Sequence, residues 1–171
     1  MKKEVIELTR KASDFSEFEW VIKAVSTDPN RKILQTVHVE TDPVEPAKSI
    51  VVATDGRRLH AAKLTGTYTP GNYRVLFRNI ARMILMSDED SGNYPAWQTV
   101  VPKCESKDMT KIESNKERGM RGFLVAIACH KLNGTVFNLD YLLDAVGALL
   151  QLYAHQVDTL SPILIRDYCE N

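Results

Sequence analysis

Residues 49–64 read SIVVATDGRRLHAAKL, two strand-like runs on either side of Asp55-Gly56. The first run, Ser49 to Thr54, is rich in β-branched side chains that favour strands. Asp-Gly favours a tight turn, because glycine readily adopts a positive φ angle. Arg58 to Leu64 then predicts a second strand, antiparallel to the first. This stretch therefore indicates an antiparallel sheet.

A strand, a helix and another strand are expected before this hairpin. Residues 5–8 place Val5, Ile6 and Leu8 among charged residues and predict the first strand. Asp14 can cap a helix, with Glu17 three residues further on. The apolar residues at helical spacing are Phe15, Phe18, Ile22 and Val25. Residues 27–30 (TDPN) end this helix, and residues 33–40 (ILQTVHVE) predict a strand after it.

Further strands are expected after the hairpin. Residues 73–78 alternate and predict a strand, whereas residues 80–86 (IARMILM) fit either a helix face or a strand face. A hairpin turning near Asn79 is favoured, because the preceding strand needs a partner for its backbone groups. Residues 87–93 predict an exposed turn, and residues 94–102 (YPAWQTVVP) an extended aromatic segment.

The remaining chain predicts a linker and a second strand–helix–strand unit. Residues 103–122 mix basic and acidic side chains with little apolar content, which is typical of a mobile linker. Residues 123–132 (FLVAIACHKL) predict a buried strand. Asn138 can cap a helix whose apolar positions are Leu139, Leu142, Leu143, Val146, Leu149 and Leu150. Closing strands are expected at residues 157–160 and 163–165.

This element order predicts an α+β fold with two β-α-β-β(-β) units, whose two helices pack against antiparallel sheets. We expect a single domain over residues 1–171, with a first half at 1–102, the mobile linker at 103–122 and a second half at 123–171. The two halves share no visible sequence similarity.

Composition sets limits on the class of protein. The chain has 22 basic and 22 acidic residues, so its zero formal charge offers no overall attraction to a polyanion. Its three cysteines form no CxxC pair, which argues against a disulfide framework or zinc knuckle and favours a reducing compartment. No apolar run approaches the length of a membrane span. The expectation is a cytoplasmic protein with no membrane partner.

Three segments resemble a known family. They are Val52 to Leu59 (VATDGRRL), Tyr94 to Pro102 (YPAWQTVVP), and Asn138 to Leu149 (NLDYLLDAVGAL) with Leu160 to Ile165 (LSPILI). In this order they resemble parts of the middle and last domains of the β subunit of bacterial DNA polymerase III, the ring-shaped DNA sliding clamp. The chain departs from the family in length, since a clamp has three such domains, and in carrying Arg57 where the family has histidine.

The resemblance implies a non-catalytic accessory protein of DNA replication that tethers a partner to DNA. A single domain cannot encircle a duplex, so this role implies a homo-oligomer. The implied partners are duplex DNA and a DNA polymerase or other replication protein bound through a short peptide motif. The alternative is a peptide-binding adaptor or decoy with the clamp fold that does not encircle DNA. No cofactor is implied.

The resemblance also implies two sets of site residues. The partner-peptide site would include Thr54, Gly56, Arg57, Arg58, Leu59, Pro95, Val100 and Pro162. Apolar side chains beside a glycine turn can form a shallow cleft for a peptide. The DNA-binding candidates are Arg31 and Lys32, just after the first helix, with Lys103 and Lys107 in the linker. The alternatives, a simple hairpin turn with core residues and a solvated loop, remain open.

Catalysis has no recognisable set of residues in the sequence. His38, His60, His130 and His155 lie far apart, and none has a metal-ligand spacing such as HExxH. Residues 88–92 (DEDSG) are similar to the start of a calcium loop, but Thr99 occupies the position of its final glutamate. Neither GxxxxGK nor GxSxG occurs. The sequence therefore predicts neither an enzyme nor a metal site.

Overall fold

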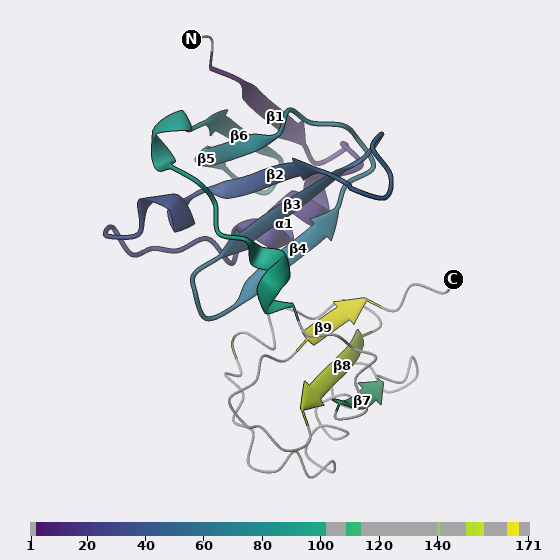
Figure 1. Ribbon diagram of the computed structural model, residues 1–171. Coiled ribbons are helices and arrows are strands. Elements are labelled where there is room, and N and C mark those ends of the chain that lie inside the picture. Colours follow the sequence, from purple (N-terminus) through teal and green to yellow (C-terminus); the bar gives the residue numbers. More distant parts are fainter. Residues whose placement is uncertain (1–2, 102–108, 114–139, 141–149, 156–163, 168–171) are drawn as a thin grey trace. The chain divides into compact units, whose positions relative to one another are not determined.

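The computed structural model describes residues 3–101, 109–113, 140, 150–155 and 164–167. The chain divides into two compact units, Met1–Pro95 and Ala96–Asn171, here named the N-terminal and C-terminal units. The N-terminal unit contains a six-stranded sheet and helix α1 (Phe15–Ile22), and the C-terminal unit contains a three-stranded sheet (Figure 1).

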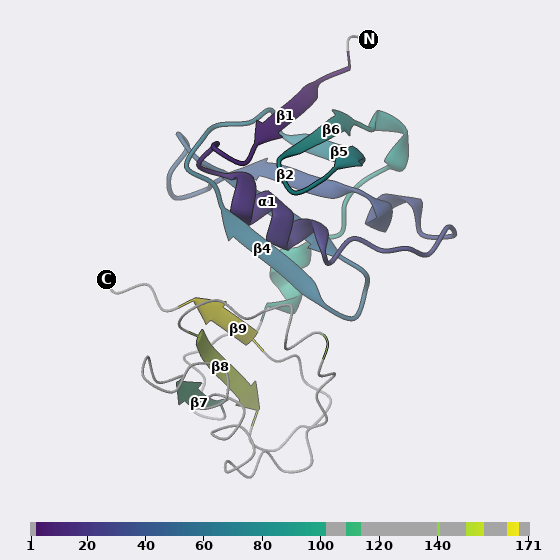
Figure 2. The same cartoon turned by 180° about the vertical axis from the view of Figure 1, so that it is seen from behind.

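The six strands of the N-terminal unit pair antiparallel throughout, in the order β1-β6-β5-β2-β3-β4. They are β1 (Val5–Thr9), β2 (Val37–Thr41), β3 (Ser49–Thr54), β4 (Leu59–Lys63), β5 (Gly71–Arg78) and β6 (Arg82–Ser87). Helix α1 lies against β3 and β4 on one face of this sheet, as Figure 2 shows. We call this face the helix face and the other the opposite face.

The core lies between α1 and the helix face. Phe18 and Val21 of α1 are fully buried, as are Val51 and Ala53 of β3. Successive side chains of a strand point to opposite faces, so Val52 and Thr54 belong to the opposite face. The other strands contribute the core residues Ile6, Leu8, Val37, Val39, Tyr73, Met83 and Leu85. This alternation explains why the strands were recognisable from the sequence.

Both hairpins expected from the sequence are confirmed. Thr54 of β3 pairs with Leu59 of β4 across the Asp55-Gly56 turn. The ambiguous residues 80–86 form the second strand of the β5–β6 hairpin, which turns at Asn79. The Asn79 side-chain oxygen accepts hydrogen bonds from the backbone N–H groups of Ala81 and Arg82, at 2.9 and 2.8 Å. The Asn79 side chain thus accepts hydrogen bonds from two backbone N–H groups within the turn, in the way that asparagine commonly stabilises tight turns.

The beginning of the chain differs from expectation in two places. The α-helix ends at Ile22 rather than Val25, and the Asp14 side chain makes no capping hydrogen bond. Its carboxylate instead binds the connection between β4 and β5. The predicted strand at residues 33–40 begins only at Val37, because Lys32–Gln35 form a 3-10 helix, η1. This turn lets the carbonyl of Leu34 accept a hydrogen bond from the Ser26 N–H at 2.8 Å.

Two short 3-10 helices follow β6, the first within the turn predicted at residues 87–93 and the second in place of part of the extended segment predicted at residues 94–102. They are η2 (Glu89–Ser91) and η3 (Trp97–Val100). Within η3 the Thr99 hydroxyl donates to the carbonyl of Ala96 at 2.7 Å. Such local side-chain bonds compete with extended structure, which explains why residues 94–102 are not extended throughout.

The C-terminal unit contains the antiparallel sheet β7-β8-β9, formed by β7 (Met109–Glu113), β8 (Leu150–His155) and β9 (Leu164–Asp167). Strand β7 lies within residues 103–122, which the sequence predicted as a linker. Its backbone hydrogen bonds come from pairing with β8, a distant contact that amino-acid composition cannot reveal. Leu150 begins a strand rather than belonging to the predicted second helix. Strand β9 overlaps the strand predicted at 163–165. The predicted strands at 123–132 and 157–160, and residues 141–149 of that helix, lie outside the described residues.

No helix among the described residues is both long and apolar enough to cross a membrane.

Candidate functional site

The turn between β3 and β4 is held by its own side chains. The Asp55 Oδ1 atom accepts hydrogen bonds from the backbone N–H groups of Arg57 and Arg58, at 2.9 and 3.0 Å. The Thr54 hydroxyl donates to the Arg58 carbonyl at 2.7 Å and accepts from the Gly56 N–H at 3.0 Å. Gly56 has a φ of +87°, which other residues adopt only with strain. The turn is therefore a fixed surface feature.

Arg58 and His60 attach this hairpin to the C-terminal end of α1. The Arg58 Nε donates to Asp55 Oδ2 at 3.1 Å, and its Nη2 donates to the Lys23 carbonyl. His60 is 4% exposed, stacks on the Trp20 ring at 4.3 Å between centroids, and forms an Nδ1 hydrogen bond with the Trp20 carbonyl. Carbonyls at a helix C-terminus lack helical partners, and a cation stabilises them. Arg58 is thus a residue that positions the turn.

Arg31 extends over the same turn. Its Nη1 lies 3.4 Å from the Asp55 carbonyl oxygen, and its Nε lies 3.5 Å from Asp28 Oδ2. A Cβ atom on Gly56 would come within 2.6 Å of Arg31 Nη1, so the glycine leaves room for this guanidinium. Arg57 is exposed, and its side chain makes no ion pair with any residue that the structure describes. Two guanidiniums thus lie at one exposed turn, where they favour an anionic group.

Tyr94 places the chain that follows β6 against the opposite face of the sheet. Its ring stacks on His38 of β2, with 4.7 Å between centroids. Burial raises the pKa of the Tyr94 hydroxyl to about 12, although the nearby backbone of Thr54 lowers it in part. On β5, Asn72 hydrogen-bonds to His38 Nδ1 and to the Gly92 carbonyl, both at 2.8 Å. These contacts hold residues 92–94 near the end of β3.

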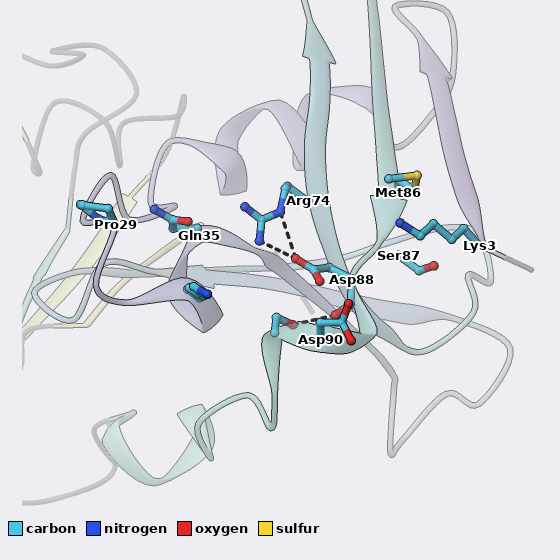
Figure 3. Close-up of a pocket in the computed structure, with 10 residues that line it drawn as sticks. Lys3, Pro29, Gln35, Arg74, Met86, Ser87, Asp88 and Asp90 are labelled. Atoms are coloured by element: carbon cyan, nitrogen blue, oxygen red, sulfur yellow. Dashed lines mark hydrogen bonds and ion pairs between the residues drawn. The ribbon is translucent and has the colours of Figure 1, made fainter. Parts of the chain in front are cut away.

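Lys32 lines a separate open pocket of about 410 Å³. In Figure 3 the ion pair between Arg74 and Asp88 lies between Pro29 and Gln35 on one side and Lys3 on the other. The Arg74 Nε and Nη2 donate to Asp88 Oδ2 at 2.9 and 2.6 Å. Because Asp88 and Asp90 line it together with Lys3, Lys32 and Arg74, this pocket is not a uniformly cationic surface.

The predicted peptide-site residues and the two linker lysines fall into three groups. Thr54, Gly56, Arg57, Arg58 and Leu59 form one hairpin, and the exposed Pro95 follows Tyr94 in the same unit. Val100 belongs to η3 in the C-terminal unit and is 55% exposed. Pro162, Lys103 and Lys107 lie outside the described residues.

Sequence reasoning missed three contributions to this surface. It did not foresee the contact of Arg31 with the β3–β4 turn, while the assignment of Arg31 to DNA stays a prediction, and it gave no role to Tyr94 or His38. The aromatic residue before Pro95 was the available signal for Tyr94. No group of three or more metal-binding side chains occurs in the described part of the chain.

The fold is similar to that of solved bacterial DNA sliding clamps. The β sliding clamp of C. crescentus matches with a TM-score of 0.58 and 18% identity, over 96% of this chain and 62% of that one. A Helicobacter pylori β clamp bound to a DNA ligase peptide matches with a TM-score of 0.56 and 16% identity, over 96% and 63%. The chain has a sliding-clamp fold.

A further clamp structure agrees with this assignment of the fold. The DNA polymerase III β subunit of Bartonella birtlesii, bound to griselimycin, matches with a TM-score of 0.52 and 17% identity, over 96% of this chain and 62% of that one. The clamp-like chain spans less than two thirds of the length of each of these clamps. No protein-family model and no curated protein matches it by sequence.

Proposed function

We propose that this clamp-like chain is a non-catalytic accessory protein of DNA replication that binds a short peptide of a polymerase or another replication protein. The observation that carries the proposal is the fixed, exposed β3–β4 turn of a clamp fold. The proposed peptide-binding residues are Thr54, Gly56, Arg57, Arg58, Leu59, Pro95, Val100 and Pro162.

The chemistry of the turn suits a short peptide. Leu59 and Pro95 offer apolar surface, while Arg31 and Arg57 offer donors to a carboxylate or a main-chain carbonyl. Because Arg58 ties the turn to α1, little ordering cost is expected on binding. One solved neighbour, the Helicobacter pylori clamp, binds a DNA ligase peptide, which supports a peptide as the ligand class.

Tethering to DNA is the second part of the proposal. Arg31, Lys32, Lys103 and Lys107 are the proposed phosphate contacts. The proposed tethering would involve several copies of the chain in a homo-oligomer that encircles the duplex.

The alternative function, a peptide-binding adaptor that does not encircle DNA, is favoured by one observation. The chain has no net charge, and α1 carries the acidic residues Glu17 and Glu19 with no basic residue in its last turn. Titrating duplex DNA at low salt separates the two functions, since only the tethering protein binds it.

The test of the peptide site uses the DNA ligase peptide that the Helicobacter pylori clamp binds, labelled for fluorescence polarisation. We expect the full chain to bind this peptide, and Leu59→Ala to weaken binding about tenfold, because apolar anchors supply most of the affinity in such clefts. Val44→Ser is the matched control, since Val44 is 81% exposed between β2 and β3. Equal affinity of Leu59→Ala and wild type, with both folded, would exclude this site.

A further inference from the structure

The end of the β5–β6 hairpin exposes three large apolar side chains. Leu76 is 54% exposed, Phe77 45% and Ile80 73%. The pairing of β5 with β6 shifts register between Val75 and Phe77, a β-bulge that gives β5 one extra residue. Without the bulge, Phe77 would share the face of the core-facing Val75, because strand side chains alternate with period two. The bulge therefore turns Phe77 away from the core.

Four cationic residues belong to this hairpin end or to the chain segment beside it. Arg78 and Arg82 flank the turn, and the N–H of Arg10 donates to the Ala81 carbonyl at 2.8 Å, which places Arg10 and Lys11 beside it. The Arg82 Nη2 lies 2.8 Å from Glu7, and the Arg78 Nη2 lies 3.9 Å from Glu19.

Two of these four cations are available to pair with an anionic partner. Arg10 and Lys11 are exposed and form no ion pair with other described residues. Among the described residues, the ion pairs of these four cations involve the two carboxylates of Glu7 and Glu19, which leaves an excess of positive charge beside the exposed apolar side chains.

We propose that the end of the β5–β6 hairpin docks an extended segment of a partner protein that combines apolar side chains with carboxylates. Leu76 and Ile80 would contact the apolar side chains, while Arg10 and Lys11 would pair with the carboxylates. Strand β1 lies at the edge of the sheet next to β6, so its outer backbone groups could pair with the same segment. This surface is separate from the β3–β4 turn, and the proposal does not depend on the function proposed there.

The composition of the surface favours a peptide over a nucleic acid. Single strands are bound by stacking bases on aromatic rings, and Phe77 is the one aromatic residue among the three exposed apolar side chains. Aliphatic side chains such as Leu76 and Ile80 match apolar protein groups better. An anionic lipid surface would also attract these cations, and the experiment below separates binding to a membrane from binding to a peptide.

The experiment measures binding of the full chain to three labelled probes: a peptide alternating leucine with glutamate, a single-stranded oligonucleotide, and vesicles containing phosphatidylserine. We expect the acidic peptide to bind best. We expect Phe77→Ser/Ile80→Ser, and separately Arg10→Glu/Lys11→Glu, each to weaken that binding about tenfold or more. Val44→Ser is the control and should bind like wild type.

Three results would overturn the proposal. They are no binding of the acidic peptide, undiminished binding by either double variant, and tighter binding of the oligonucleotide or the vesicles than of the peptide. Because all substituted side chains are exposed, circular dichroism should show that each variant keeps the fold. If a double variant unfolds, the single variants Ile80→Ser and Lys11→Glu replace it, each expected to weaken binding severalfold.

Discussion

Replacing Phe18 with alanine is expected to lower the free energy of unfolding of the N-terminal unit by about 3 to 5 kcal/mol, the usual cost of truncating a buried phenylalanine. Phe18 is fully buried between α1 and the sheet, and its ring meets Tyr68 edge to face with 5.4 Å between centroids. Urea unfolding followed by Trp20 fluorescence, in a shared Trp97→Phe background, measures this unit alone.

The matched control is Phe77→Ala, since Phe77 is 45% exposed at the β5–β6 hairpin. It should cost under about 1 kcal/mol, because nearly half of the Phe77 surface already contacts water and its removal leaves no closed cavity in the core. Equal destabilisation by the two variants would contradict a core centred on α1.

Replacing Asp14 with alanine is expected to cost about 2 to 4 kcal/mol, because four hydrogen bonds to one buried carboxylate are lost at once. Asp14 is 2% exposed and accepts hydrogen bonds from the N–H and hydroxyl of Thr65, each at 2.7 Å. It also accepts from the Gly66 N–H and the Tyr68 hydroxyl, each at 3.0 Å. The same urea titration measures the loss, with the exposed Asp90→Ala as a control expected to change little.

The pH dependence gives a second readout for Asp14. Burial raises the pKa of this carboxyl, but the hydrogen bonds from Thr65, Gly66 and Tyr68 outweigh it and lower the pKa overall. A lowered pKa in the folded state stabilises the fold above the unfolded pKa of about 3.9 and loses this contribution as the pH falls through the folded value. Wild type should therefore lose more stability than Asp14→Ala in this acid range. Parallel stability curves for the two proteins would rule out this role.

Most of the secondary structure of the N-terminal unit could be predicted from its sequence. The β3–β4 and β5–β6 hairpins and most of α1 were predicted, because one face of each element is buried and its apolar residues recur at the matching period. The turn residues Gly56 and Asn79 indicated equally directly where the two hairpins turn. Local patterns suffice where local geometry decides the structure.

Contacts between distant residues were not predictable from those patterns. Asp14 satisfied the local rule for a helix cap, yet its partners lie more than 50 residues away in Thr65 and Gly66. The hydrogen bond from Arg31 to the Asp55 carbonyl was not foreseen, because it depends on the space that Gly56 leaves, while the DNA contact assigned to Arg31 stays a prediction. Both side chains are directed by tertiary packing, which a single sequence does not display.

The resemblance to sliding clamps predicted the fold correctly at the level of the N-terminal sheet and its helix. The solved neighbours share that fold at 15–18% identity. The second helix, and the two β-α-β units that it would complete, remain predictions. Within the C-terminal unit, the strand that begins at Leu150 was not anticipated, because leucine at helical spacing also suits a strand.

The most direct test of the central claim is a map of where the DNA ligase peptide contacts this chain, obtained from backbone amide chemical shifts with and without peptide. The account predicts that the largest changes occur at residues 54–59 and around Tyr94, with little change at the β5–β6 hairpin. Changes confined to other regions, or no change at saturating peptide, would contradict a clamp-like peptide site at the β3–β4 turn.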